Sequence, residues 1–362
     1  MREANPLATM TRDDLGQRLQ TIRGAIWQES LNGDRYALLL RDFTDLTDAT
    51  SSPEDRPVTS GDDPAVTRSA LGAWLIRDPA VARHVLADVR FGFRRPDGAK
   101  AHLQILPATR SRLNVERPEL TRMIEAARPV LGAEAVPAHR PAIRAHAEDL
   151  LREADFTAFD LVTDYANPLA RRVLSSVLGA DAVIGEHWAG LGLVPDGTAT
   201  PQRLADAVAL SKALKHVEAA FAETDADPDV LAFRMAASVL FAATAPNVIA
   251  RAAADGGPVD AVLHAHPPLR LLSRVAHTEV DLAGTTVGAG EQVVVLVADA
   301  QAHGPVLDAD PQYGLVLPLV RLTAEVATET LRAGRNVETG KPLRRLRSPV
   351  TGTLLRLPVT AR

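Results

Sequence analysis

One stretch of the chain has a clear β pattern, and it comes late in the sequence. Val280–Ala298, VDLAGTTVGAGEQVVVLVA, predicts a hairpin that turns near Gly288–Gly290 and continues into a strand of β-branched residues. Nearly every patterned segment before it has the three-to-four-residue periodicity of helices. Many helices followed by one small sheet predict a mainly α fold with a compact β region.

The helical patterns recur along most of the chain, and one long polar segment interrupts them. Residues 42–64 contain three prolines and many Asp, Ser and Thr residues, and we expect a mobile surface loop there. Helical sequence of the same composition resumes after it, and we find no internal repeat, so we expect a single domain over 1–362. The predicted helices cover 78–88, 117–131, 138–154, 159–180 with a kink near Pro168, 202–221, 229–254 and 325–332, and terminal strands are predicted within 344–358.

The N-terminal region predicts an amphipathic helix over residues 11–27. Its apolar residues recur at spacings of four, three and four, which places them on one helix face: Leu15, Leu19, Ile22 and Ile26. Asp13 and Asp14 lie at the predicted start, where the helix dipole favours negative charge. This stripe has two possible roles. It packs on the protein's own core, as such stripes usually do, or it contacts a partner.

The bulk properties exclude several classes of function. A net charge of −5 and a pI near 6.1 argue against a nucleic-acid partner or an anionic membrane surface. The N-terminal residues lack the apolar core of a signal peptide, and the most apolar run, 287–300, is too short to span a bilayer. We therefore expect a soluble, cytoplasmic protein.

The chain has no cysteine, which excludes disulfides, Cys-ligated zinc and iron–sulfur clusters. The histidines do not replace them. His264 and His266 are two residues apart, so on a helix they point about 200° apart. His139 and His146 are two helical turns apart with no carboxylate at ligand spacing, and His102 has no such partner either. We expect no metal, cofactor or catalytic residue.

The segment Arg270–Pro305, RLLSRVAHTEVDLAGTTVGAGEQVVVLVADAQAHGP, resembles the β-sheet segment of bacterial cytochromes P-450. The resemblance implies a shortened cytochrome P-450 fold. In that family a Cys thiolate holds the haem iron. The alignment of VRLTAEVATETL with the helix after that cysteine implies that the thiolate position falls near Gly314, so the fold is expected to lack haem.

The resemblance also locates the family's oxygen-activating helix in this chain. It implies that Leu240–Ala250, LFAATAPNVIA, is the matching stretch. Thr244 is retained, but its neighbours cannot relay protons: Ala243, Ala245 and Pro246. The sequence therefore lacks the polar groups that this chemistry requires.

Two further motifs of the family are missing. Ala261 and His264 stand at the positions of its Glu-x-x-Arg pair, and neither can form that ion pair. Ala300–Gly304, AQAHG, replaces its asparagine-arginine-aspartate run. Several independent losses in a well-patterned chain indicate a fold that is maintained without its catalysis.

One subfamily has the same pattern. The N-terminal LGQRLQTIRGAIWQESLNGDRYALLL and the C-terminal LRRLRSPVTGTLLRLPV look like the ends of the cytochrome P-450-like auxiliary proteins that activate deoxysugar glycosyltransferases in macrolide and anthracycline pathways. The resemblance implies a non-catalytic protein that binds a glycosyltransferase and stabilises its active conformation. It also makes the N-terminal helix the candidate contact, with these residues: Leu15, Leu19, Ile22, Ile26 and Trp27.

Two other functions stay open from sequence: a haem-binding oxygenase with an unusual ligand, and a small-molecule carrier that uses the former haem cavity. Arg274 occupies the place of the family's haem-propionate arginine, and a structural salt bridge is the favoured interpretation. The cluster Arg344, Arg345 and Arg347 is interpreted as a solvated or partner-facing edge, because the protein is acidic.

Overall fold

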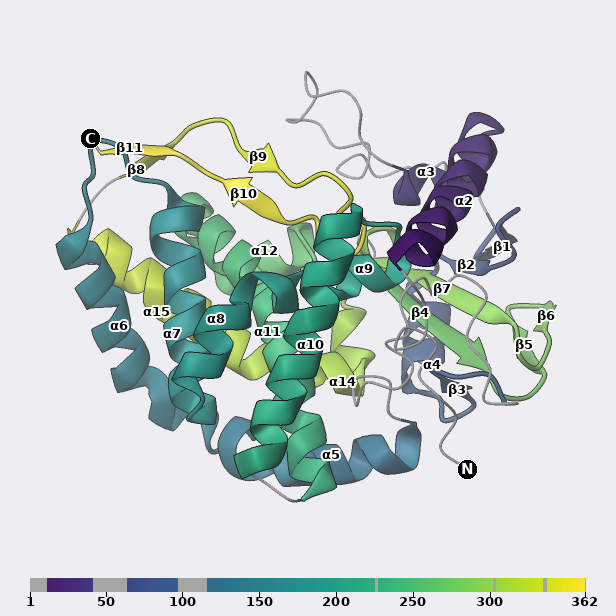
Figure 1. Cartoon of the computed structure of the whole chain (residues 1–362), viewed down its shortest axis with the longest axis horizontal. Helices are drawn as coiled ribbons and strands as arrows, with labels where there is room; N and C mark the ends of the chain where they lie inside the picture. The colour runs from purple at the N-terminus through teal and green to yellow at the C-terminus, as the bar shows by residue number, and fades with distance from the viewer. Residues whose placement is uncertain are drawn as a thin grey trace.

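The structure is a computed structural model that describes residues 12–41, 64–96, 116–224, 227–301, 304–334 and 337–361. A body of packed helices forms one side of the molecule and a small twisted sheet the other, while the C-terminal hairpins cross the top of the helical body in the view of Figure 1. The predicted loop 42–64 lies outside the described residues, apart from Pro64.

The helical body confirms the prediction of a mainly α fold. The α-helices of the described residues are α2 (Arg12–Leu31), α3 (Arg35–Leu40), α4 (Pro79–Ala87), α5 (Arg117–Leu131), α6 (Arg140–Glu153), α7 (Asn167–Leu178), α8 (Asp181–Gly192), α9 (Val194–Ala199), α10 (Leu204–Thr224), α11 (Pro228–Asp255), α12 (Val259–Ala265), α13 (Val297–Gln301), α14 (Pro311–Gly314) and α15 (Leu317–Gly334). Shorter helical turns are η3 (Val136–His139), η4 (Leu161–Ala166) and η5 (Leu307–Ala309).

Within the described ranges, the β region contains one five-stranded sheet and three two-stranded ones. Its strands are β1 (Val66–Arg68), β2 (Trp74–Ile76), β3 (Phe91–Gly92), β4 (Leu271–Ala276), β5 (Val280–Leu282), β6 (Thr285–Val287), β7 (Gln292–Leu296), β8 (Val337–Thr339), β9 (Leu343–Arg344), β10 (Leu354–Arg356) and β11 (Val359–Ala361). The larger sheet has the order β1-β2-β7-β4-β3, with β2 and β7 parallel and the other neighbours antiparallel.

Helix α11 forms the centre of the core. Asp227 caps its start through the backbone N–H groups of Asp229 and Val230, and Gly256 ends it in the left-handed conformation. Among the described residues it is the one helix long and apolar enough to cross a membrane, but 89% of its most apolar window is buried inside the protein. It is therefore a core helix.

The predicted hairpin turn was wrong by several residues. The chain turns at Ala283–Gly284, between β5 and β6, and both residues have positive φ, of 52° and 82°. A two-residue turn with this geometry matches the twist of the strands that it joins. Gly288 and Gly290 instead lie in the connection to β7, which pairs with β4 and β2.

The predicted helix over 159–180 is interrupted at the expected place. Its first part is the π-helical turn η4, and α7 begins at Asn167, directly before Pro168. Proline removes a backbone donor and so favours such a break. The Tyr165 hydroxyl on η4 donates to the carbonyl of Ala327 at 2.8 Å, which fixes the break against α15.

A buried carboxylate fixes the C-terminal hairpins to the helical body. Asp196 on α9 has no exposed surface, and its oxygens accept from the backbone N–H of Val350 at 2.8 Å and the hydroxyls of Ser348 at 3.0 Å and Thr351 at 2.6 Å. Burial raises the pKa of this carboxyl, and the hydrogen bonds oppose that change. The loop before β10 is thus bound to the protein interior.

We predict that Asp196→Ala lowers the free energy of unfolding by about 3 kcal/mol or more, because it leaves several buried donors without an acceptor. Urea denaturation monitored by circular dichroism measures the change. The matched control is Glu186→Ala, because this side chain is 76% exposed. Equal stabilities of the two variants would contradict the structural role of Asp196.

Candidate functional site

The first region of interest is the face of α11 that the family's chemistry would use. Thr244 is fully buried, and its hydroxyl donates to the carbonyl of Leu240 at 2.6 Å, one turn earlier on the same helix. Phe241 lies beside it and is also fully buried. The retained threonine is therefore engaged within its own helix.

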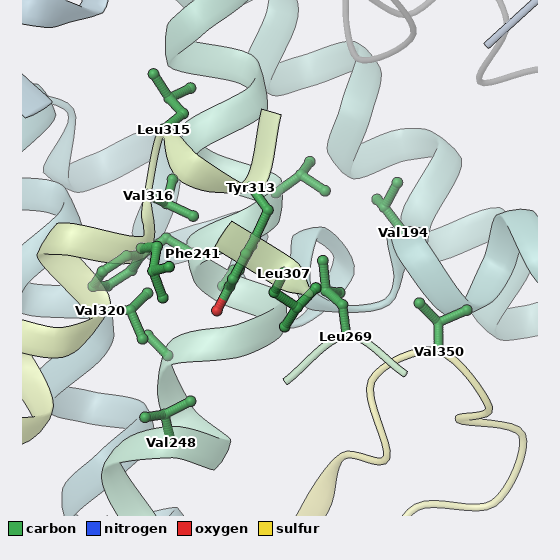
Figure 2. Packing of buried hydrophobic residues seen from close by; sticks show 14 of the residues in the cluster. Val194, Phe241, Val248, Leu269, Leu307, Tyr313, Leu315, Val316, Val320 and Val350 are labelled. Atoms are coloured by element: carbon green, nitrogen blue, oxygen red, sulfur yellow. The ribbon is translucent and has the colours of Figure 1, made fainter. Parts of the chain in front are cut away.

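Tyr313 fills the space opposite this face. Figure 2 shows its ring between Phe241 and Val320 on one side and Leu307 on the other. The residue is only 1% exposed, and its hydroxyl interacts with that of Thr244. Burial raises the pKa of this hydroxyl. Gly314, the position aligned with the missing thiolate, directly follows this ring.

A buried ion pair holds Tyr313 in place. Arg274 on β4 pairs with Asp310, and the two side chains are 5% and 2% exposed. The other oxygen of Asp310 accepts from the backbone N–H groups of Gln312 at 2.8 Å and Tyr313 at 3.1 Å, which caps α14. The guanidinium also lies 4.3 Å from the centre of the Phe93 ring. The structure supports the interpretation of Arg274 as a structural salt-bridge residue.

Two pockets border this region, one of about 170 Å³ and one of about 300 Å³. A cavity of about 170 Å³ lies between α9, α11 and the sheet, and apolar side chains such as Val194, Leu240 and Val294 form most of its wall. An engineered protein cavity of about 150 Å³ holds one benzene molecule. This pocket therefore has the size for a small ring, and the larger one lies between α12 and α15, with Leu307 and Tyr313 in its wall.

The residues present do not fit a haem. The chain has no thiolate, Tyr313 occupies the space beside Gly314, and a protein carboxylate already neutralises Arg274. Among the described residues no three His, Asp or Glu side chains gather as a metal site. We therefore derive no chemistry through a haem.

Helix α12 shows what replaced the Glu-x-x-Arg pair. Ala261 and His264 are both exposed, so they no longer face the core. The amide of Gln301 donates to the carbonyl of Leu263 at 2.7 Å and so ties α12 to α13. His102 lies outside the described residues.

The N-terminal helix α2 is longer than predicted and reaches Leu31. Two residues of its stripe are buried in the protein's own core: Leu19 is 3% exposed and Ile26 is 4% exposed. Ile22 is half-buried and packs against the same core, and the side chain of Leu15 lies outside what the structure describes. The core interpretation therefore holds for Leu19 and Ile26, which are not available to a partner.

Trp27 is the member of the candidate contact that remains accessible. It is 42% exposed, and the guanidinium of Arg41 lies 4.1 Å from the centre of its ring. Two further exposed side chains on α2 and α3, Leu31 and Leu38, were missed from the sequence because they lie outside the regular stripe.

The comparisons with known proteins cover almost the whole chain. No protein-family model matches it. It is 30% identical to Protein AknT of Streptomyces galilaeus over 97% of this chain and 96% of that one. It is 31% identical to Protein DesVIII of Streptomyces venezuelae, over 96% and 94%, and 30% identical to Cytochrome P450 family protein EryCII of Saccharopolyspora erythraea, over 98% and 99%.

Solved structures confirm the fold. CYP154A1 from Streptomyces coelicolor A3(2) superposes with a TM-score of 0.67 and 20% identity, over 85% of this chain and 97% of that one. A mutant of P450 EryK in complex with erythromycin B gives 0.64 and 21%, over 85% and 95%.

The fold is that of a cytochrome P-450, yet the positions of its chemistry hold alanine, a tyrosine ring and an internal ion pair. The full-length relatives share this scaffold at about 30% identity. The chain belongs to the non-catalytic, cytochrome P-450-like auxiliary proteins that activate glycosyltransferases of macrolide and anthracycline biosynthesis.

Proposed function

We propose that this protein forms a lasting hetero-oligomer with a deoxysugar glycosyltransferase in the cytoplasm and holds that enzyme in its active conformation. The observations that support this role are the buried Tyr313 ring and the buried Arg274–Asp310 pair, which the protein's own side chains supply. Because side chains occupy positions that a cofactor would need, we expect the protein to act by binding a partner at its surface.

The activation follows from linkage. A protein that binds only the competent state of an enzyme raises the population of that state by its differential affinity. A preference of about 3 kcal/mol changes the ratio of two states roughly a hundredfold. The auxiliary protein needs no contact with either substrate for this effect.

We propose the exposed part of the N-terminal helices as the contact. Trp27, Leu31 and Leu38 form what we call the helix face, and they are 42%, 66% and 45% exposed. The buried residues Leu19 and Ile26 anchor α2 to the core and so present this face in one orientation. Arg41 lies against the Trp27 ring and limits its freedom, which lowers the entropic cost of binding.

We predict that Trp27→Ala weakens binding to the glycosyltransferase by about 2 kcal/mol, or about 30-fold, because large aromatic anchors dominate interfaces. Isothermal titration calorimetry measures the affinity, and glycosyl transfer measured with and without this protein gives the activation. The control is Val89→Ala, an exposed apolar residue on another part of the chain. Unchanged affinity of the Trp27 variant would exclude this contact.

A change within the buried stripe should act differently. Leu19→Asp is expected to destabilise the fold by on the order of 3 kcal/mol or more, because it places an unpaired charge in the core. A thermal melt checks this expectation before any binding assay. A variant with the melting temperature of the wild type would show that the burial of Leu19 does not contribute to the stability of the fold.

The purified protein should show no haem absorption band after expression with a haem precursor. The lack of a cysteine and the position of Tyr313 are the reasons for this expectation. An absorption spectrum with a protein-matched haem titration tests it. A Soret band at one haem per chain would favour the oxygenase alternative.

A further inference from the structure

Large exposed apolar side chains are unevenly distributed over the described surface. Seven are exposed there, and six of them lie on two elements: Trp27, Leu31 and Leu38 on the helix face, and Leu343, Leu346 and Leu355 on the β9–β10 hairpin. The seventh is Val89. Single exposed apolar residues are normal on a monomer, whereas clusters mark interaction sites. We call the second cluster the hairpin face.

The hairpin is a two-sided element whose outer side lacks cover. Leu354 and Leu357 are buried, while Leu355, which is 41% exposed, and Arg356 are both exposed, because a register shift in the pairing with β9 interrupts the alternation of the strand between Leu354 and Arg356. Strands β9 and β10 pair only with each other among the described residues. The inner side therefore explains why the hairpin packs on the protein, and the outer side remains available.

The hairpin is held firmly enough to serve as a binding surface. Asp196 binds the loop before β10, as described above. Asn247 on α11 donates to the carbonyl of Thr351 at 3.0 Å and accepts from the backbone N–H of Leu354 at 2.8 Å. On the other strand, Arg345 pairs with Asp206 of α10 at 3.3 Å. Preorganised elements lose little entropy when they bind.

The elements that carry the two faces are linked through one segment. The segment between α9 and α10 joins them: Arg23 of α2 donates to the carbonyl of Gln202 at 3.5 Å, and the Gln202 amide donates to the carbonyl of Arg347 at 2.9 Å. Thr200 in the same segment donates to the carbonyl of Leu40 at the end of α3. Figure 1 shows α2, α3, β9 and β10 along the upper edge, on either side of α9.

Charge indicates the chemistry of the occupant. Residues 337–361 contain five Lys or Arg side chains and one acidic residue, whereas the whole chain has a net charge of −5. Lys341 and Arg356 are exposed beside the hairpin leucines. A partner surface that matches this region is apolar at its centre and carries Asp or Glu at its rim.

We propose that the hairpin face is the second half of the docking surface, and that it takes an apolar patch rimmed by carboxylates on the same glycosyltransferase. This rests on the proposed function. The partner then contacts the protein at two elements, the helix face and the hairpin face, with the segment 200–203 between them.

The test is the double variant Leu343→Glu and Leu355→Glu in the full-length protein. We expect its affinity for the glycosyltransferase to fall by about tenfold or more, because the charges are buried against an acidic surface. Val89→Glu is the matched control and should bind like the wild type, since it adds a charge at an exposed apolar residue elsewhere. The paired substitution Lys341→Glu and Arg356→Glu should slow association, and this loss should shrink as salt is raised.

The outcomes separate the two proposals. Failure of the wild-type protein to bind overturns the proposed function itself. A double variant that binds and activates like the wild type overturns the hairpin face alone. If circular dichroism shows that the double variant is unfolded, Leu355→Ser with Leu343→Ser replaces it under the same criteria. Light scattering on the isolated protein tests the other occupant: a self-dimer that the double variant disrupts would show that a second copy covers the hairpin and would overturn the proposal.

Discussion

The buried pair of Arg274 and Asp310 connects strand β4 with the segment that carries Tyr313. A guanidinium inside a protein requires a compensating anion, since an unpaired buried charge is strongly destabilising. The same carboxylate caps α14, which sets the Tyr313 ring between α11 and α15. One acidic residue thus joins the sheet to the helical body and fills the interior at the same time.

Positions that serve chemistry in the parent fold serve packing here. The Thr244 hydroxyl satisfies a carbonyl of its own helix, and the Gln301 amide satisfies one on α12. Both side chains therefore hydrogen-bond within the protein itself. The fold can therefore remain intact while its function moves to the surface.

Periodicity predicted the long helices well, because α5, α10 and α11 each repeat their pattern over several turns. It could not predict β1, β2 or β3, which are two or three residues long and are defined by pairing with distant segments. It placed the start of α15 too late, at residue 325 where the helix begins at Leu317; Pro318 lies in the first helical turn, where no donor is needed. It also identified the stripe on α2 but not its orientation. Whether Leu19 faces the core depends on tertiary packing, and the exposure of Trp27 follows from the same packing.

The two hydrogen bonds between Asn247 and the hairpin determine how binding at the hairpin would affect the protein's core. This one amide bridges the central helix and the strand beneath the hairpin face. The strand cannot shift without stretching its hydrogen bonds to α11, most of whose residues are buried. The hairpin and the core are therefore coupled. A glycosyltransferase bound at the hairpin would slow the hydrogen exchange of backbone amides in the core of this protein as well as at the contact.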